Sequence, residues 1–114
     1  MSSAIENIRL AKEASSSLAQ ATASQKNAAL GQIASLLRVR TPEILMANEK
    51  DLALSDANGV SESMKDRLRL TEERIEAMAQ SISLIINLSD PVGDVIRGMT
   101  LANGLRLTQV RVPL

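Results

Sequence analysis

Apolar positions return every three or four residues along the first 90 residues of the chain, which is the spacing of one face of an α-helix. The first such stripe lies within residues 3–21 and runs through Ile5, Ile8, Ala11, Ser15 and Leu18. A second stripe runs through Ala29, Ile33, Leu36 and Leu37. It follows Ser24, a residue type that caps helices, and ends where Arg38 and Arg40 would meet the negative end of the helix dipole. The pattern therefore predicts two amphipathic helices.

A third helix has the strongest start signal in the chain. Thr41 suits the N-cap, Pro42 has the backbone torsion of a first helical residue, and Glu43 favours the positive end of the dipole. Its apolar side is predicted to contain Ile44, Leu45, Asn48 and Leu52. Gly59 should end this helix, because glycine accepts the left-handed conformation found after many helices.

Two further helix starts follow. Ser61 should cap a short helix through Met64 and Leu68, and Thr71 should open a longer helix that ends before Pro91. The apolar face of the longer helix is predicted to contain Ile75, Met78, Ala79, Ile82, Ile85 and Ile86.

After Pro91 the period of the apolar pattern changes to about two residues, which indicates strands. Asn103 and Gly104 separate two such segments, 95–101 and 105–112. Because both residue types tolerate a positive φ, they predict a tight two-residue hairpin turn. Leu105 and Leu107 share one face of the second arm, whereas Val110 and Val112 share the other face, so we expect a β-bulge near Thr108 or Gln109.

Composition excludes several kinds of chemistry. The 114 residues suffice for one core, which must be aliphatic because no aromatic residue is present. The chain has no Cys and no His, so it cannot supply a thiolate nucleophile, an imidazole base, a disulfide or the usual zinc ligands. We expect no catalytic, cofactor-binding or metal-binding residue in this chain.

Charge argues against nucleic acid and membranes as partners. Lys and Arg total 13 and Asp and Glu also total 13. The densest basic stretch, residues 64–69 with Arg74, lacks stacking aromatics and is neutralised by Glu62, Asp66, Glu72 and Glu73. The apolar stretch at residues 82–86 is far shorter than a membrane span. We therefore expect a cytoplasmic protein that binds neither nucleic acid nor a bilayer.

A few polar residues are candidates for a site. Neighbouring carboxylates, Glu49 with Asp51 or Glu72 with Glu73 and Glu76, could serve acid–base chemistry only if one had a raised pKa, and such acids usually face water. Asn48 lies on an apolar stripe and needs a partner. We favour a bond from its amide to the backbone of a neighbouring helix, with ligand contact by Asn48, Asp51 or Arg67 as the alternative. For Arg111, cross-strand pairing is favoured over anion binding.

Five runs of the sequence, with matching order and spacing, resemble one enzyme family. They are residues 43–52, 66–75, 90–93, 103–105 and 111–114. With these runs the chain resembles the N-terminal part of the gamma-glutamyl phosphate reductases, also called glutamate-5-semialdehyde dehydrogenases, within the aldehyde dehydrogenase superfamily. Departures occur at Gly98-Met99-Thr100, where members often carry Trp, and at Ala102, where they often carry Pro.

Pattern and resemblance together predict a mainly α fold, in which four to five packed helices precede an antiparallel β-hairpin. In the family this arrangement is the N-terminal part of an aldehyde-dehydrogenase-like α/β fold. Residues 1–90 would be the helical region, and residues 91–114 a hairpin that leads into a dinucleotide-binding domain missing here. Since a lone hairpin is marginal in water, we expect it to pair with residues outside these 114.

The resemblance also implies a function. Family members use NADPH and a cysteine thiolate to convert glutamyl 5-phosphate to glutamate 5-semialdehyde in L-proline biosynthesis. This chain alone would then be inactive and without bound cofactor, its partner would be the remainder of its own polypeptide, and the full-length enzyme would be a homo-oligomer. The alternative from the residues is a free-standing helical protein-interaction module.

Overall fold

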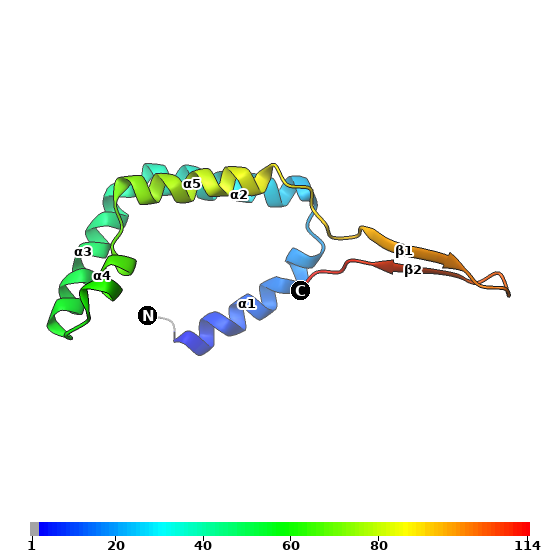
Figure 1. The fold of residues 1–114 in the computed structure, drawn as a ribbon, viewed down its shortest axis with the longest axis horizontal. Helices are drawn as coiled ribbons and strands as arrows, with labels where there is room; N and C mark the ends of the chain where they lie inside the picture. Colours follow the sequence, from blue (N-terminus) through cyan, green and yellow to red (C-terminus); the bar gives the residue numbers. More distant parts are fainter. Residues whose placement is uncertain (1–2) are drawn as a thin grey trace. The chain divides into compact units, whose positions relative to one another are not determined.

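A computed structural model describes residues 3–114, which form five helices and a two-stranded antiparallel sheet (Figure 1). In chain order the elements are α1 (Ala4–Ala19), α2 (Ala23–Val39), α3 (Thr41–Ala57), α4 (Glu62–Leu68), α5 (Glu72–Ile86), β1 (Val95–Thr100) and β2 (Arg106–Val110). The predicted fold class, mainly helical with a C-terminal hairpin, is confirmed. Contacts divide these elements into two compact units, one with α1 and the hairpin and the other spanning Lys26–Leu88. None of the described helices is long and apolar enough to cross a bilayer.

Helix α1 begins as its cap predicts. The Ser3 hydroxyl accepts the backbone N–H of Glu6 at 3.1 Å, so one of the free N–H groups of the first turn is satisfied. The helix contains no buried residue, and its stripe of Ile5, Ile8 and Leu18 is exposed. Its periodicity therefore reflects an apolar face that nothing in the described chain buries.

Helix α2 begins with a reciprocal capping box at Thr22, and the predicted cap at Ser24 is wrong. The Thr22 hydroxyl accepts the Gln25 backbone N–H at 3.1 Å, and the Gln25 side-chain oxygen accepts the Thr22 N–H at 2.9 Å. This pair satisfies two backbone donors, whereas a single serine cap satisfies one.

Helices α2 and α3 meet at an elbow in which Arg40 alone separates them. The predicted cap at Thr41 is wrong, because its hydroxyl donates to the Leu37 carbonyl of α2 at 2.8 Å. Arg40 occupies the N-cap position without a side-chain cap bond, and proline stands in the first turn of α3 as predicted. Because only one residue joins the two helices, Thr41 is the first residue of α3, and its hydroxyl bonds a carbonyl in the last turn of α2.

The end of α3 and the starts of α4 and α5 agree with the sequence. Gly59 has a φ of +67°, and the Val60 N–H donates to the Ser55 carbonyl at 3.1 Å, as in a Schellman motif. The Ser61 hydroxyl accepts a backbone N–H from the first turn of α4 at 3.4 Å, and the Thr71 hydroxyl does the same for α5 at 3.1 Å. Local capping chemistry therefore sets these three boundaries.

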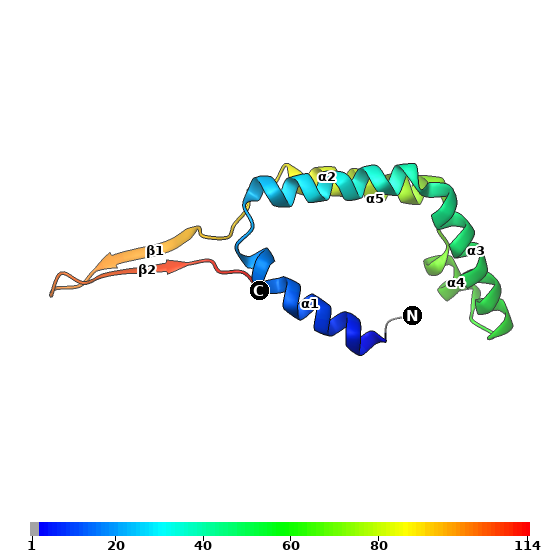
Figure 2. The same ribbon diagram turned by 180° about the vertical axis from the view of Figure 1, so that it is seen from behind.

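The Lys26–Leu88 unit has a small interior. Ala34 of α2 and Ile75 and Ala79 of α5 are its buried apolar residues, and Asn48 of α3 is buried with them. Helices α2 and α5 run side by side in both views (Figures 1 and 2). The Arg38 guanidinium of α2 donates to both carboxylate oxygens of Glu76 of α5 at 2.9 Å, which links the two helices.

Only part of each predicted apolar face is covered. On α2 the buried or half-buried side is Leu30, Ala34 and Leu37, whereas the predicted Ile33 and Leu36 remain exposed. One neighbouring helix covers only one stripe of a helix surface, and the apolar positions of α2 span a wider arc than that.

Helix α5 shows the same division. Ile75 is 1% exposed and Ala79 is fully buried, while Ile82 is half-buried. Met78 and Ile85, predicted on the same face, are exposed. The predicted face is therefore correct at its centre and too broad at its edges.

The hairpin has a bulge, but on the first strand. Val95 pairs with Val110 and Arg97 with Gln109, so Ile96 is the extra residue. The predicted bulge on the second arm is therefore wrong, although the irregularity lies at the same level of the ribbon. A bulge shifts the face alternation only of the strand that carries it, so Leu107 and Val110 of the regular second strand lie on opposite faces of the ribbon, and both are exposed.

The turn contains three residues rather than the two predicted. The Gly104 N–H donates to the Leu101 carbonyl at 2.9 Å, and the Leu101 N–H donates to the Leu105 carbonyl at 2.8 Å. Gly104 has a φ of +85°, while no described non-glycine residue has a positive φ. Asn103 instead uses its side-chain oxygen to accept the Leu105 N–H at 3.0 Å. This geometry matches a three-residue loop with glycine in the left-handed position.

Candidate functional site

The buried amide of Asn48 is held by backbone on both sides. Its Nδ2 donates to the Leu68 carbonyl at 2.9 Å, and its Oδ1 accepts the Leu70 N–H at 2.8 Å. The side chain lies between α3 and the segment that joins α4 to α5, and it is 6% exposed. The predicted bond to the backbone of a neighbouring helix is confirmed, and the amide has a structural role.

Asp51 and Arg67 do not join this site. Asp51 is exposed on α3, and its backbone carbonyl accepts the Ser55 hydroxyl at 2.9 Å. Arg67 is exposed on α4, in a shallow concavity that it shares with Met78. Of the three polar residues considered for ligand contact, only Asn48 is buried, whereas Asp51 and Arg67 are exposed.

The basic stretch around α4 is neutralised within the unit. The Arg74 guanidinium donates at 2.6 Å to the carbonyl oxygens of Asp66 and Arg69 and reaches the Asp66 carboxylate at 3.3 Å. Lys65 pairs with Asp56 at 2.5 Å. The two bonds from Arg74 satisfy carbonyls at the C-terminal end of α4, where helical partners are lacking. The predicted neutralisation by Asp66 is confirmed.

Two of the candidate carboxylates have lowered pKa values, which makes them unsuited to general-acid chemistry. The bidentate bond from Arg38 lowers the pKa of Glu76, with a further contribution from Gln80. The pKa of Glu73 is lowered by its own backbone N–H and by the Thr71 hydroxyl. A general acid at neutral pH needs a raised pKa, so these groups act as ion-pair and capping partners. Among residues 3–114 no group of three or more acidic side chains is placed to hold a metal ion.

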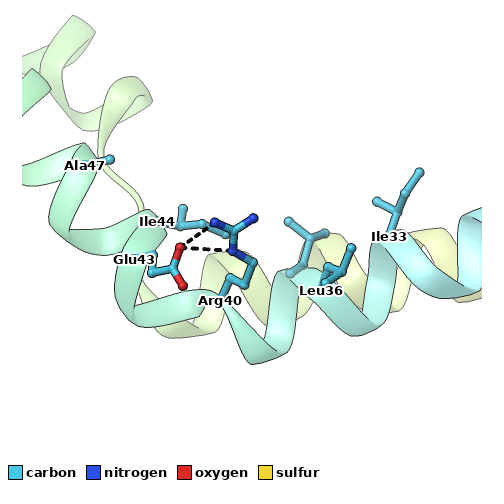
Figure 3. A pocket seen from close by; sticks show the side chains of 7 residues that line it. Ile33, Leu36, Arg40, Glu43, Ile44 and Ala47 are labelled. Carbon is cyan, nitrogen blue, oxygen red and sulfur yellow. Dashed lines mark hydrogen bonds and ion pairs between the residues drawn. The ribbon is translucent and has the colours of Figure 1, made fainter.

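The elbow between α2 and α3 carries a groove of about 490 Å³, which we term the elbow groove (Figure 3). Its lining residues are Ile33, Leu36, Leu37, Arg40, Glu43, Ile44 and Ala47. The Arg40 guanidinium bonds the Glu43 carboxylate at 2.6 Å within it. The sequence pattern did not predict this groove. Its signal was the excess width of the apolar arc on α2, which a single helix neighbour cannot cover.

No family model matches the chain. Curated proteins that match it are named gamma-glutamyl phosphate reductase. A gamma-glutamyl phosphate reductase of Thermobifida fusca is 51% identical over 104 residues, which are 91% of this chain and 25% of the relative. The corresponding reductase of Halalkalibacterium halodurans is 45% identical over all 114 residues and 27% of its own length. The chain thus spans about a quarter of the length of the curated relatives it matches.

Solved structures agree with the sequence comparison. The crystal structure of gamma-glutamyl phosphate reductase from Thermotoga maritima matches 96% of this chain with a TM-score of 0.87 and 41% identity, over 26% of its own length. The enzyme from Saccharomyces cerevisiae matches 99% of the chain with a TM-score of 0.85 and 32% identity, over 29% of its own length. In sequence and in fold, this chain resembles the N-terminal segment of the gamma-glutamyl phosphate reductases.

Proposed function

We propose that this chain is the N-terminal part of an oxidoreductase that reduces glutamyl 5-phosphate to glutamate 5-semialdehyde in L-proline biosynthesis. The observation that carries the proposal is the match of all 114 residues at 45% identity to a gamma-glutamyl phosphate reductase, together with the TM-score of 0.87 to a solved reductase. Five helices and a hairpin in the same arrangement are far more specific than any single motif.

In this proposal the reactive groups lie outside the chain. A cysteine thiolate of the longer polypeptide displaces phosphate from the acyl carbon and forms a thioester, and NADPH supplies the hydride that reduces it. The chain has no Cys. Its positive-φ glycines at 93 and 104 lie in turns that flank and close the hairpin, and not at a strand-to-helix junction of the kind that cradles phosphate. We therefore assign no catalytic or cofactor-binding residue here.

The part played by these residues is structural. The side chains of Asn48 and Arg74 bond the backbone at both ends of the α4–α5 connection, and part of the apolar surface of this unit is exposed. We propose that the remainder of the polypeptide is the partner, that the complete enzyme is a cytoplasmic homo-oligomer of the aldehyde dehydrogenase superfamily, and that the 114 residues alone are inactive.

The experiment compares three samples for NADPH oxidation with glutamyl phosphate. They are the 114-residue chain, the longer polypeptide that carries it, and the longer polypeptide lacking residues 1–114. We expect turnover only from the longer polypeptide, and recovery of turnover when the two parts are mixed or co-expressed. Turnover by the short chain would contradict its inactivity, and an inactive longer polypeptide would contradict the function itself.

A free-standing interaction module is the second candidate, and the exposed stripe of α1 is the observation that favours it. The two functions differ in what the isolated chain does. A monomer that stays soluble and melts cooperatively would favour the module, whereas association through exposed apolar faces would favour a segment that needs its remainder. Gel filtration combined with calorimetry distinguishes these outcomes.

A further inference from the structure

Two Asn-Gly pairs, Asn58-Gly59 and Asn103-Gly104, lie in the same local backbone setting. Gly59 has a φ of +67° and Gly104 a φ of +85°. Each glycine N–H donates to the carbonyl three residues before it, at 3.2 Å in the first pair and at 2.9 Å in the second. Because glycine has no Cβ, its backbone nitrogen is open to close approach in both pairs. A difference in reactivity between the two asparagines must therefore come from the structure around them.

The side-chain amide of Asn103 is held in place, whereas that of Asn58 is not. The Oδ1 atom of Asn103 accepts the Leu105 N–H at 3.0 Å. Since this bond spans Gly104, it keeps the amide carbon beside the backbone nitrogen of that glycine. The Leu105 N–H is also placed to stabilise negative charge that develops on Oδ1, as the donors of an oxyanion hole do. Within residues 3–114 the side chain of Asn58 makes no hydrogen bond.

The two turns also differ in how firmly the glycine N–H is kept on its carbonyl. At the end of α3, the N–H of Val60 also donates back to the helix at 3.1 Å, and the ion pair of Lys65 with Asp56 connects this end to α4. The hairpin turn closes a ribbon of two strands in which every residue is exposed. A two-stranded ribbon is marginally stable in water, and segments with little burial open most readily. Release of the N–H should therefore cost less at Gly104 than at Gly59.

We propose that Asn103 is a site of spontaneous deamidation. The Gly104 nitrogen loses its proton to solvent base and attacks Cγ of Asn103, so that a new carbon–nitrogen bond closes a succinimide ring. The bond from Cγ to the side-chain nitrogen breaks, and that nitrogen takes up a proton and leaves as ammonia. Solvent water then opens the ring at either of its carbonyl carbons, which gives aspartate or isoaspartate. No group is oxidised or reduced, and water is the only co-reactant.

The modification changes the turn that joins the two strands. Both products put a negative charge at position 103, and isoaspartate also adds one carbon to the main chain before Gly104. The bond from the Gly104 N–H to the Leu101 carbonyl, which closes the loop, then loses its spacing. Because only the turn takes part, the modification is independent of the proposed reductase activity.

Peptide mapping of the 114-residue chain tests the assignment. The chain is incubated in mildly alkaline buffer made with heavy-oxygen water, and mass spectrometry measures the label at positions 58 and 103 in the same digest. We expect Asn103 to react several-fold faster than Asn58 in the folded chain. In concentrated urea the two rates should converge, because both are then unstructured Asn-Gly pairs. The matched variant Asn103→Gln should lose the label at position 103 and keep the rate at position 58.

Equal rates in the folded chain, or faster reaction at Asn58, would overturn the proposal. Amide hydrogen exchange checks the opening step separately, and we expect faster exchange at Gly104 than at Gly59. Slower exchange at Gly104 would contradict the difference in opening on which the proposal rests. If circular dichroism shows that the short chain is not helical, both measurements are made on the longer polypeptide that carries it, with the same outcomes for and against.

Discussion

The side-chain oxygen of Asn48 accepts the backbone N–H of Leu70 at 2.8 Å, although the two residues are 22 positions apart. The same amide donates to the Leu68 carbonyl at 2.9 Å. One side chain of α3 therefore holds the backbone on both sides of Arg69, at the point where α4 stops and the chain turns into α5.

Loss of this amide should destabilise the helical unit strongly. Asn48→Ala leaves a partly buried N–H and a partly buried carbonyl without partners, and we expect the free energy of unfolding to fall by about 2–4 kcal/mol. Urea denaturation of the 114-residue chain, followed by circular dichroism, measures the change. Glu49→Ala is the control, because Glu49 is exposed on the same helix. Equal effects of the two substitutions would contradict the role of the amide.

Truncation of the buried isoleucine should have a similar effect. Ile75 is 1% exposed, and Ile75→Ala creates a cavity that costs about 2–5 kcal/mol. Ile85 lies on the same helix and is 51% exposed, so Ile85→Ala should cost well under half as much in the isolated chain. Thermal melts of the two variants make the comparison. If Ile85→Ala were the more damaging, the observed packing face of α5 would be wrong.

The ion pair between α2 and α5 should make stability depend on pH. Arg38 lowers the pKa of Glu76 below its ordinary value of 4.5 in the folded chain. The stabilisation is therefore fully present above that pH and is lost as the pH falls through the lower folded pKa. Wild type and Glu76→Gln should differ in urea midpoint at neutral pH and converge in acid. Because both side chains are 44% exposed, we expect a small difference that added salt reduces. A difference that grew in acid would contradict the assignment.

Two glycines of the helical region should respond to alanine with opposite signs. Gly59 has a φ of +67°, so Gly59→Ala should destabilise the unit by about 1 kcal/mol. Gly31 lies inside α2, and an added Cβ there would meet nothing within 4 Å, so Gly31→Ala should stabilise it by about 0.5–1 kcal/mol. Urea denaturation of each variant, compared with that of the wild type, measures the two changes in the free energy of unfolding. A stabilising Gly59→Ala would show that α3 does not end in the left-handed conformation.

Local chemistry explains which features the sequence predicted correctly. Ser61 and Thr71 cap helices because a hydroxyl can reach an N–H three residues away, and Gly59 ends one because it lacks a Cβ. These interactions lie within one turn of backbone, so the printed sequence contains all that they need. The sequence also predicted that Asn48 bonds backbone, because a buried amide needs hydrogen-bond partners.

The wrong predictions concern two helix caps and the position of the β-bulge. Ser24 and Thr22 are both able to cap α2, and only Thr22 has a glutamine at the reciprocal position. Thr41 is a good cap in isolation, but a one-residue elbow places it where its hydroxyl reaches Leu37. The phase change along the second arm needs no bulge there, because both faces of that strand are exposed and either can carry apolar side chains; the extra residue is Ile96 on the first strand. For both caps, a residue in the adjacent turn decided which bond the hydroxyl makes.

The order of the amino acids by itself determined the element types, most of their boundaries and the absence of cysteine and histidine chemistry, because these follow from short-range bonding and composition. Only the tertiary structure decided which side of α2 is buried, that Asn48 reaches Leu68 and Leu70, and that Ile33 and Leu36 remain open. Those outcomes depend on which apolar surfaces meet in space, and hydrophobic attraction has no direction that a one-dimensional pattern records.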